Sequence, residues 1–197
     1  MFTKYSIVHK TCWGFGEIGL ESSFWLGLEP LHQLTGNGGY TRMRVEMYSD
    51  EGSWYSAEYQ HFSVDNETTG YRLNISGYWG DAGNHLWLSH GQNFSTFDHG
   101  PQSSKAMMLE GGWWCSEYYD AACLNGAYEA SLMYTYAPSE ITGFYWNSGH
   151  PPVSPPEVWN IQDVTPGRLI MSRIMITRPW PRYDDLDDDD DDDLELW

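Results

Sequence analysis

The sequence is poor in basic residues and has no long apolar run. Ten Lys and Arg stand against 28 Asp and Glu, which gives a formal net charge of −18 at pH 7. The bases form no cluster, so a nucleic-acid partner is not expected, because phosphate binding needs a concentrated positive face. No stretch of about 18 consecutive apolar residues occurs, so the sequence predicts no membrane span.

The N-terminal residues show no secretory signal. Residues 1–16 lack an apolar core and a small-residue cleavage site. The protein is then either intracellular or a fragment of a secreted one. Three Asn-X-Ser/Thr triplets begin at Asn66, Asn74 and Asn93 and favour secretion with glycosylation at these positions, although such triplets also arise by chance.

Motifs of the common enzyme classes are also absent. The chain has no GxSxG elbow, HExxH pair, P-loop or dinucleotide fingerprint. It has neither CxxC nor HxxxH spacing, so a structural zinc site is not expected. The sequence therefore predicts a protein that is not an enzyme.

Aromatic residues are abundant, with 11 Trp, 14 Tyr and 7 Phe. This number exceeds what a core of this size needs, which favours a recognition surface for sugars or for protein. A Trp-rich core with Tyr on the faces of a sheet is the alternative.

Acidic residues concentrate at the C-terminus. Nine Asp and one Glu lie in residues 184–197, so the first 183 residues carry 18 acids against 10 bases. A block of like charge cannot bury itself, so we predict one domain over residues 1–182 and a disordered acidic tail over 183–197. Loose binding of a cation or of a basic partner is the alternative for the tail.

Hydrophobic periodicity predicts short helices and an antiparallel sheet. Ser22 and Ser23 are candidate helix caps, and apolar residues at a spacing of three follow, which predicts a helix that Pro30 kinks or breaks. Residues 41–48, 54–64 and 71–78 alternate as strands of a meander. In the third strand Asn74 is expected on the solvent face. From 80 to 168 the pattern is irregular, which is typical of a functional loop region.

Seven phrases of the sequence occur in the order found in fibrinogen-like C-terminal domains, the module of fibrinogen chains, ficolins, tachylectins, tenascins and angiopoietins. They are GFGEIGLESSFWLGLEPLHQLT, YTRMRVEMYSDEGSWYSAEYQHFSV, YRLNISGYWGDAGN, HGQNFSTFD, GGWW, LNGAY and RLIMSRIMITRP. This resemblance covers residues 13–179. It implies an α+β fold with a central twisted antiparallel sheet over about 13–85, a loop-rich ligand-binding subdomain over about 86–168 and a strand at 169–178 that returns to the sheet.

The chain also departs from the family pattern. It lacks the N-terminal subdomain, which leaves one edge of the sheet uncovered and predicts self-association. In the family's calcium loop two aspartates stand two apart, and the corresponding residues here are Asp98 and Gly100. With Asp98 and the carbonyls of Gly100, Gln102 and Ser104 as its ligands, the calcium site is expected to be weak or lost.

The family's loop disulfide cannot form either, because its cysteines correspond to Lys105 and Tyr118. If the chain is oxidised, Cys115 and Cys123 are the expected pair and Cys12 is left over. Three buried thiols are the alternative.

The resemblance implies a non-catalytic, secreted recognition domain. Lectin members of the family bind acetyl groups beside the calcium loop, so we expect binding of glycans or acetylated groups on microbial or matrix surfaces. The expected ligand-binding residues are Tyr118, Tyr119, Tyr128 and Trp146, and packing of these rings within the loops is the alternative. A second function hypothesis is a protein-binding module of the angiopoietin or tenascin type, without sugar binding.

Overall fold

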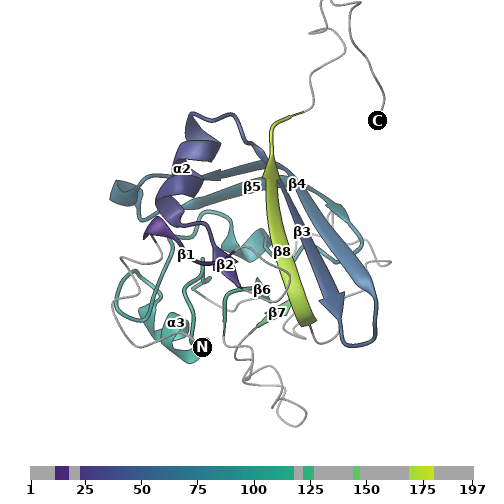
Figure 1. Ribbon diagram of the computed structural model, residues 1–197. Helices are drawn as coiled ribbons and strands as arrows, with labels where there is room; N and C mark the ends of the chain where they lie inside the picture. The colour runs from purple at the N-terminus through teal and green to yellow at the C-terminus, as the bar shows by residue number, and fades with distance from the viewer. Residues whose placement is uncertain (1–11, 18–22, 118–121, 127–143, 147–168, 180–197) are drawn as a thin grey trace, which may run out of the picture.

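A four-stranded antiparallel sheet forms the centre of the molecule. The computed structural model describes residues 12–17, 23–117, 122–126, 144–146 and 169–179. The sheet has the order β5-β4-β3-β8 (Figure 1). Its strands are β3 (Arg42–Ser49), β4 (Trp54–Val64), β5 (Leu73–Gly80) and β8 (Leu169–Thr177). The α+β class and the antiparallel sheet predicted from the sequence are confirmed.

Shorter elements surround the sheet. Two small sheets pair β1 with β2 and β6 with β7. Their bounds are β1 (Phe15–Gly16), β2 (Phe24–Trp25), β6 (Ala122–Cys123) and β7 (Tyr145–Trp146). The helices are α2 (Leu28–Gly36) and α3 (Ser103–Met108), with the 3-10 turns η1 (Glu67–Thr69) and η2 (Trp87–Ser89). No helix among the described residues is long and apolar enough to cross a membrane.

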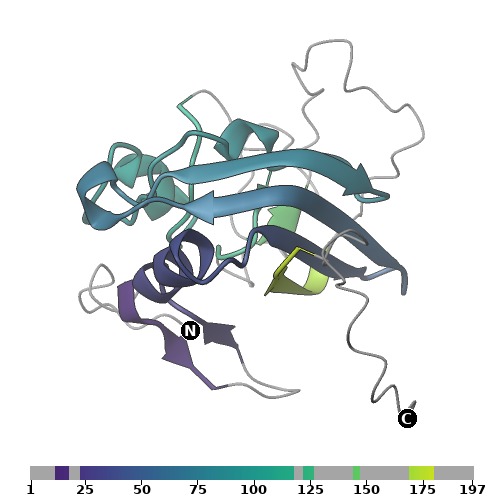
Figure 2. The ribbon, with the colours of Figure 1, turned by 90° about the horizontal axis from the view of Figure 1, so that it is seen from above.

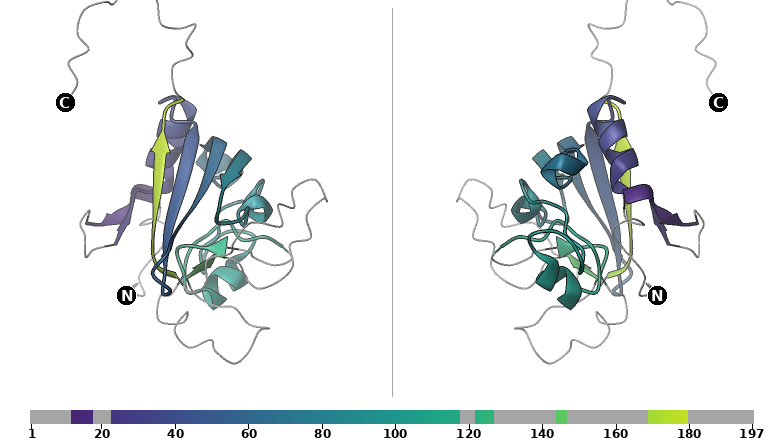
Figure 3. Two further views of the ribbon diagram at one scale, coloured as in Figure 1. Left: turned by 90° about the vertical axis from the view of Figure 1, so that its right-hand side faces the viewer. Right: turned by 90° about the vertical axis from the view of Figure 1, so that its left-hand side faces the viewer.

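Strand alternation assigns the two faces of the sheet. In β3, Met43, Val45 and Met47 are buried, while the residues between them are only half-buried. The apolar face packs against the loops that follow β5, and the Tyr59 hydroxyl of β4 donates to Asn84 Oδ1 at 2.9 Å. Both views of Figure 3 show α3 and its neighbouring loops on one side of the sheet and the β1–β2 pair on the other.

Helix α2 begins later than the sequence pattern predicted. Trp25 belongs to β2, and the helix starts at Leu28 with Gly27 as its N-cap. Pro30 therefore falls in the first turn, where a backbone N–H has no partner within the helix, so the predicted kink is wrong. The helix lies beside the far end of β4 (Figure 2), where the Val64 N–H donates to Thr35 Oγ1 at 3.1 Å.

Strand β8 returns from the far end of the chain and pairs antiparallel with β3 along its whole length. Among the described residues it has no strand on its other side. Four of its apolar side chains are 36–47% exposed, namely Ile170, Met171, Ile174 and Met175. An edge strand with such side chains is a site for pairing with other chains.

Candidate ligand-binding site

The loop after η2 forms a tight turn that is fixed to the segment around Trp113. The Ser95 N–H donates to the Trp113 carbonyl at 2.9 Å, and the Trp113 N–H donates back at 3.0 Å. The Thr96 N–H donates to the His99 carbonyl at 2.8 Å, and the Thr96 hydroxyl donates to Asp98 Oδ1 at 2.8 Å. Residues 95–99 are thereby held in one shape by backbone and side-chain hydrogen bonds.

The predicted calcium ligands lie on this loop and at the start of α3. Asp98 is exposed. The carbonyl of Gln102 accepts the Ala106 N–H at 3.0 Å in the first turn of α3, so one of its lone pairs is already used. Ser104 lies inside α3. Among the described residues, no group of three or more His, Cys, Asp or Glu side chains is placed to hold a metal.

Gly100 shows why a second aspartate does not fit here. Its φ of +95° is rarely adopted by residues with a side chain. A Cβ at this position would lie 2.6 Å from Ser95 Oγ and 2.7 Å from the Phe94 carbonyl oxygen. Ser95 Oγ also accepts the Gln102 N–H at 3.0 Å. The residues present therefore do not fit the two-aspartate calcium loop, and a weak or lost site stays our prediction.

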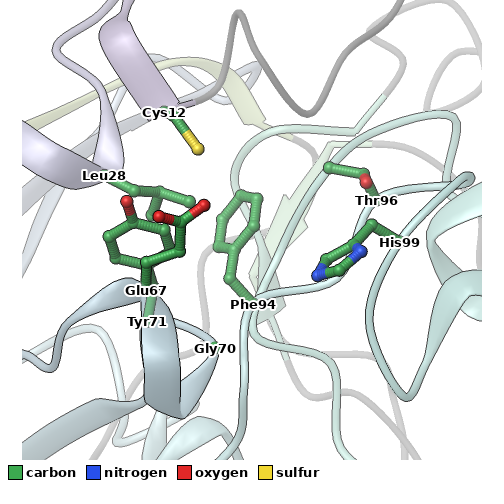
Figure 4. A pocket seen from close by; sticks show the side chains of 8 residues that line it. All are labelled: Cys12, Leu28, Glu67, Gly70, Tyr71, Phe94, Thr96 and His99. Carbon is green, nitrogen blue, oxygen red and sulfur yellow. The ribbon is translucent and has the colours of Figure 1, made fainter.

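A small pocket opens beside this loop (Figure 4). Its volume is about 40 Å³. The lining residues are Cys12, Leu28, Glu67, Gly70, Tyr71, Phe94, Thr96 and His99. Figure 4 shows the Phe94 ring in the middle, with Cys12, Leu28, Glu67 and Tyr71 to one side and Thr96 and His99 to the other. The pocket thus combines an apolar floor with a polar rim.

Two polar groups on one side of the pocket, the Tyr71 hydroxyl and the Cys12 thiol, stay neutral at physiological pH. The Tyr71 hydroxyl donates to Glu29 Oε2 at 3.1 Å. Burial and the neighbouring Cys12 raise the pKa of Tyr71 well above its usual value. Burial also raises the pKa of the Cys12 thiol. These two groups therefore offer hydrogen bonds without charge to a small ligand.

The buried tryptophans of the loops anchor them to the sheet. Trp114 Nε1 donates to the Tyr71 carbonyl at 2.7 Å. Trp146, which we predicted to bind ligand, is 1% exposed, and its Nε1 donates to the Ala82 carbonyl at 2.8 Å. A ring buried in this way has no face open to a sugar, so Trp146 supports the core instead. The other predicted ligand-binding residues, Tyr118, Tyr119 and Tyr128, lie outside the described residues.

His85 was not found by sequence reasoning. It is 6% exposed and meets the edge of Trp146 at a ring distance of 6.0 Å. Burial lowers its pKa to about 4, so the imidazole is neutral at physiological pH. A single histidine between Asn84 and Leu86 carries no local signal of burial, since its partner lies far along the chain.

The predicted disulfide cysteines and the asparagines of the glycosylation triplets differ in burial. Cys115 and Cys123 are both fully buried, and their disulfide in an oxidised chain stays a prediction. Asn66 is exposed and caps η1. Asn74 alternates with the buried Leu73 and Ile75, as predicted, but it is partly buried, and its Nδ2 donates to Asp65 Oδ1 at 3.1 Å. Asn93 is half-buried as well. Asn66 is the most accessible of the three triplets.

Comparison with known proteins agrees with this architecture. The family model for the C-terminal globular domain of fibrinogen beta and gamma chains matches residues 5–153. Angiopoietin-4 of Bos taurus is 43% identical over 141 residues, which are 68% of this chain and 26% of that protein. Techylectin-5A of Tachypleus tridentatus is 37% identical over 118 residues, which are 58% of this chain and 39% of that protein.

A solved structure supports the same assignment. The fibrinogen-like globe domain of human ANGPTL6 superposes with a TM-score of 0.65 and 26% identity, and the match covers 87% of this chain and 70% of that one. The chain spans between a quarter and two fifths of the length of the two curated relatives. On the family match and the shared fold, this chain belongs to the family of fibrinogen C-terminal globular domains.

Proposed function

We propose that this chain is a non-catalytic, secreted recognition domain that binds glycans or acetylated groups on microbial or matrix surfaces. The observation that carries the proposal is the pocket of Figure 4. Leu28 and Phe94 give it an apolar floor, and Thr96 and His99 give it a polar rim. An acetyl group has a methyl end and a carbonyl end, so it suits a space of about 40 Å³ with this division.

Each pocket is expected to bind weakly. So small a volume buries little ligand surface, and a single acetyl group offers few contacts. Linking several weak sites raises avidity by about 10² to 10⁴ when all of them reach the same surface. The proposed domain therefore acts on surfaces that display many copies of its ligand, and it needs clustering to bind them measurably.

The test compares the monomer with a streptavidin-clustered form on beads that carry N-acetylglucosamine. We expect retention of the clustered form alone, competed by free N-acetylglucosamine. His99→Ala removes part of the polar rim and should reduce retention. His61→Ala, at another exposed histidine on β4, is the matched control and should not reduce retention. If clustering adds nothing, or if both variants behave as wild type, the acetyl proposal fails.

A second candidate is a protein-binding module without sugar binding. The 43% identity with angiopoietin-4 favours it, and the exposed edge of β8 offers a surface for strand pairing. A blank glycan array, together with saturable binding to a defined receptor ectodomain that Ile174→Lys abolishes, would replace the first proposal with this one.

A further inference from the structure

The face of the central sheet that carries Arg44 and Glu46 has a second and larger groove. Its volume is about 230 Å³. The lining residues are Arg44, Glu46, Trp54, Tyr55, Ser56 and Asp81, from β3, β4 and the turn after β5. This outer groove shares no lining residue with the pocket of Figure 4. It is therefore a separate feature that the proposed loop site does not use.

A row of alternating charges crosses the sheet at the floor of the outer groove. Arg173 Nε on β8 donates to Glu46 Oε2 at 2.6 Å, and Arg44 Nε donates to Glu46 Oε1 at 2.8 Å. Arg44 also pairs with Glu58 on β4. Burial acts to raise the pKa of Glu46, but the hydrogen bonds from Arg173 and Arg44 outweigh it and lower that pKa. These ion pairs keep the row charged at neutral pH.

Trp54 forms an aromatic wall of the groove. Its side chain is 49% exposed, although it begins a strand of the central sheet. Two neighbours hold the ring in place, since the Tyr48 ring centroid lies 5.0 Å away and Arg173 Cζ lies 5.8 Å from the centroid of Trp54. A ring that is held and still half accessible loses little freedom when a ligand stacks on it.

The rim carries a carboxylate in a defined position. Gly80 ends β5 with a φ of +135°, and a Cβ there would lie 2.3 Å from the Ser56 carbonyl oxygen. This close approach brings Asp81 over β4, where its Oδ1 accepts the Ser56 N–H at 2.7 Å and its own N–H donates to the Ser56 carbonyl at 3.1 Å. A carboxylate accepts several hydrogen bonds, so Asp81 can accept a further one from a ligand in the groove.

From these features we propose that the outer groove binds one neutral pyranose ring. Sugar hydroxyls both donate and accept, which matches the neighbouring guanidinium of Arg44 and the carboxylates of Glu46 and Asp81. The apolar face of the ring stacks on Trp54. A charged ligand fits less well, because the members of the charged row already have opposite partners and would have to give them up. The volume is below the roughly 300 to 1,000 Å³ of sites for larger ligands.

The experiment titrates the full chain with the methyl glycosides of glucose, galactose and mannose and follows the tryptophan indole N–H signals by NMR. We expect saturable shifts with at least one of the three. Trp54→Ala should weaken binding about tenfold or more. Trp79→Ala is the matched control, because Trp79 is 54% exposed on the same face, opposite Glu58, yet does not line the groove. It should leave the affinity unchanged.

Ser56→Phe provides a second perturbation that keeps Trp54 and fills the groove, so it should cause the same loss. A wild-type chain that binds none of the three glycosides overturns the inference. Equal losses in Trp54→Ala and Trp79→Ala overturn it as well. Binding that His99→Ala removes and Trp54→Ala does not would overturn this inference and leave the proposed acetyl site standing. Melting curves confirm that each variant is folded.

Discussion

The substitution Gly100→Asp tests whether the loop after Ser95 has truly lost its calcium chemistry or lacks only one side chain. The new residue must adopt a φ of +95°, which costs about 1–2 kcal/mol. Its Cβ would also displace Ser95 Oγ, now 2.6 Å from that position. The hydrogen bond from the Gln102 N–H would then be lost, at about 0.5–1.5 kcal/mol. We expect unfolding to become easier by about 2–3 kcal/mol.

Thermal unfolding measures this loss as a fall of about 4–12 °C in the melting temperature of a domain of this length. Gly91→Asp is the matched control, because Gly91 has a φ of +76° but nothing lies within 4 Å of its Cβ position. Gly91→Asp should therefore lose only the stability that a side chain at positive φ costs. Calorimetry on residues 1–182, without the acidic tail, should find no tight calcium binding in wild type or variant. If Gly100→Asp binds calcium tightly and has the same melting temperature as Gly91→Asp, the reasoning about the loop is refuted.

Three further predictions concern stability and association. Burial lowers the pKa of His85 from its ordinary value of 6.5 to about 4. The folded state should therefore lose roughly 3 kcal/mol of stability as the pH falls from about 6.5 to 4. His85→Gln should flatten this pH dependence in urea titrations at several pH values. Trp146→Phe removes the donor to the Ala82 carbonyl and should lower the free energy of unfolding by about 1–3 kcal/mol. Trp13→Phe, at a 63% exposed position, should change it little in the same melting experiments. Ile174→Lys on the edge strand β8 should reduce concentration-dependent association in sedimentation experiments. Met107→Lys, at a 61% exposed site on α3, should leave this association unchanged. A wild-type chain that stays monomeric at high concentration would contradict the prediction that β8 mediates self-association.

The central sheet could be predicted because its signal is local. Alternation with a period of two appears within each strand, so residues 41–48 and 54–64 were predicted within a residue of β3 and β4. The helix was less well predicted, because the apolar spacing did not show where the backbone first turns. Gly27 fixes that point with a φ of +103°. Burial of Leu28 and Leu31 then extends the helix along β4.

The ligand-binding residues could not be predicted in the same way, because exposure depends on distant contacts. Trp146 lies in a sequence that reads as an open loop, yet its indole reaches a carbonyl 64 residues away. Trp54 lies in a regular strand, and its alternation marks it only as a solvent-facing residue. The burial of Trp146 and the groove beside Trp54 both depend on residues far away in the sequence, so neither can be derived from the local pattern.

The surplus of aromatic residues therefore has two physical roles, which the sheet separates. On the core side, buried rings anchor a loop that lacks the disulfide of the family pattern. Trp114 binds the Tyr71 carbonyl at 2.7 Å, and Lys105 Nζ, where a family cysteine would lie, donates to the Ser116 carbonyl at 2.5 Å. These bonds need neither an ion nor an oxidising environment, so the described part of the loop can keep its shape without either. On the outer side Trp54 remains half-exposed beside a row of ion pairs, where its ring is still open to a ligand.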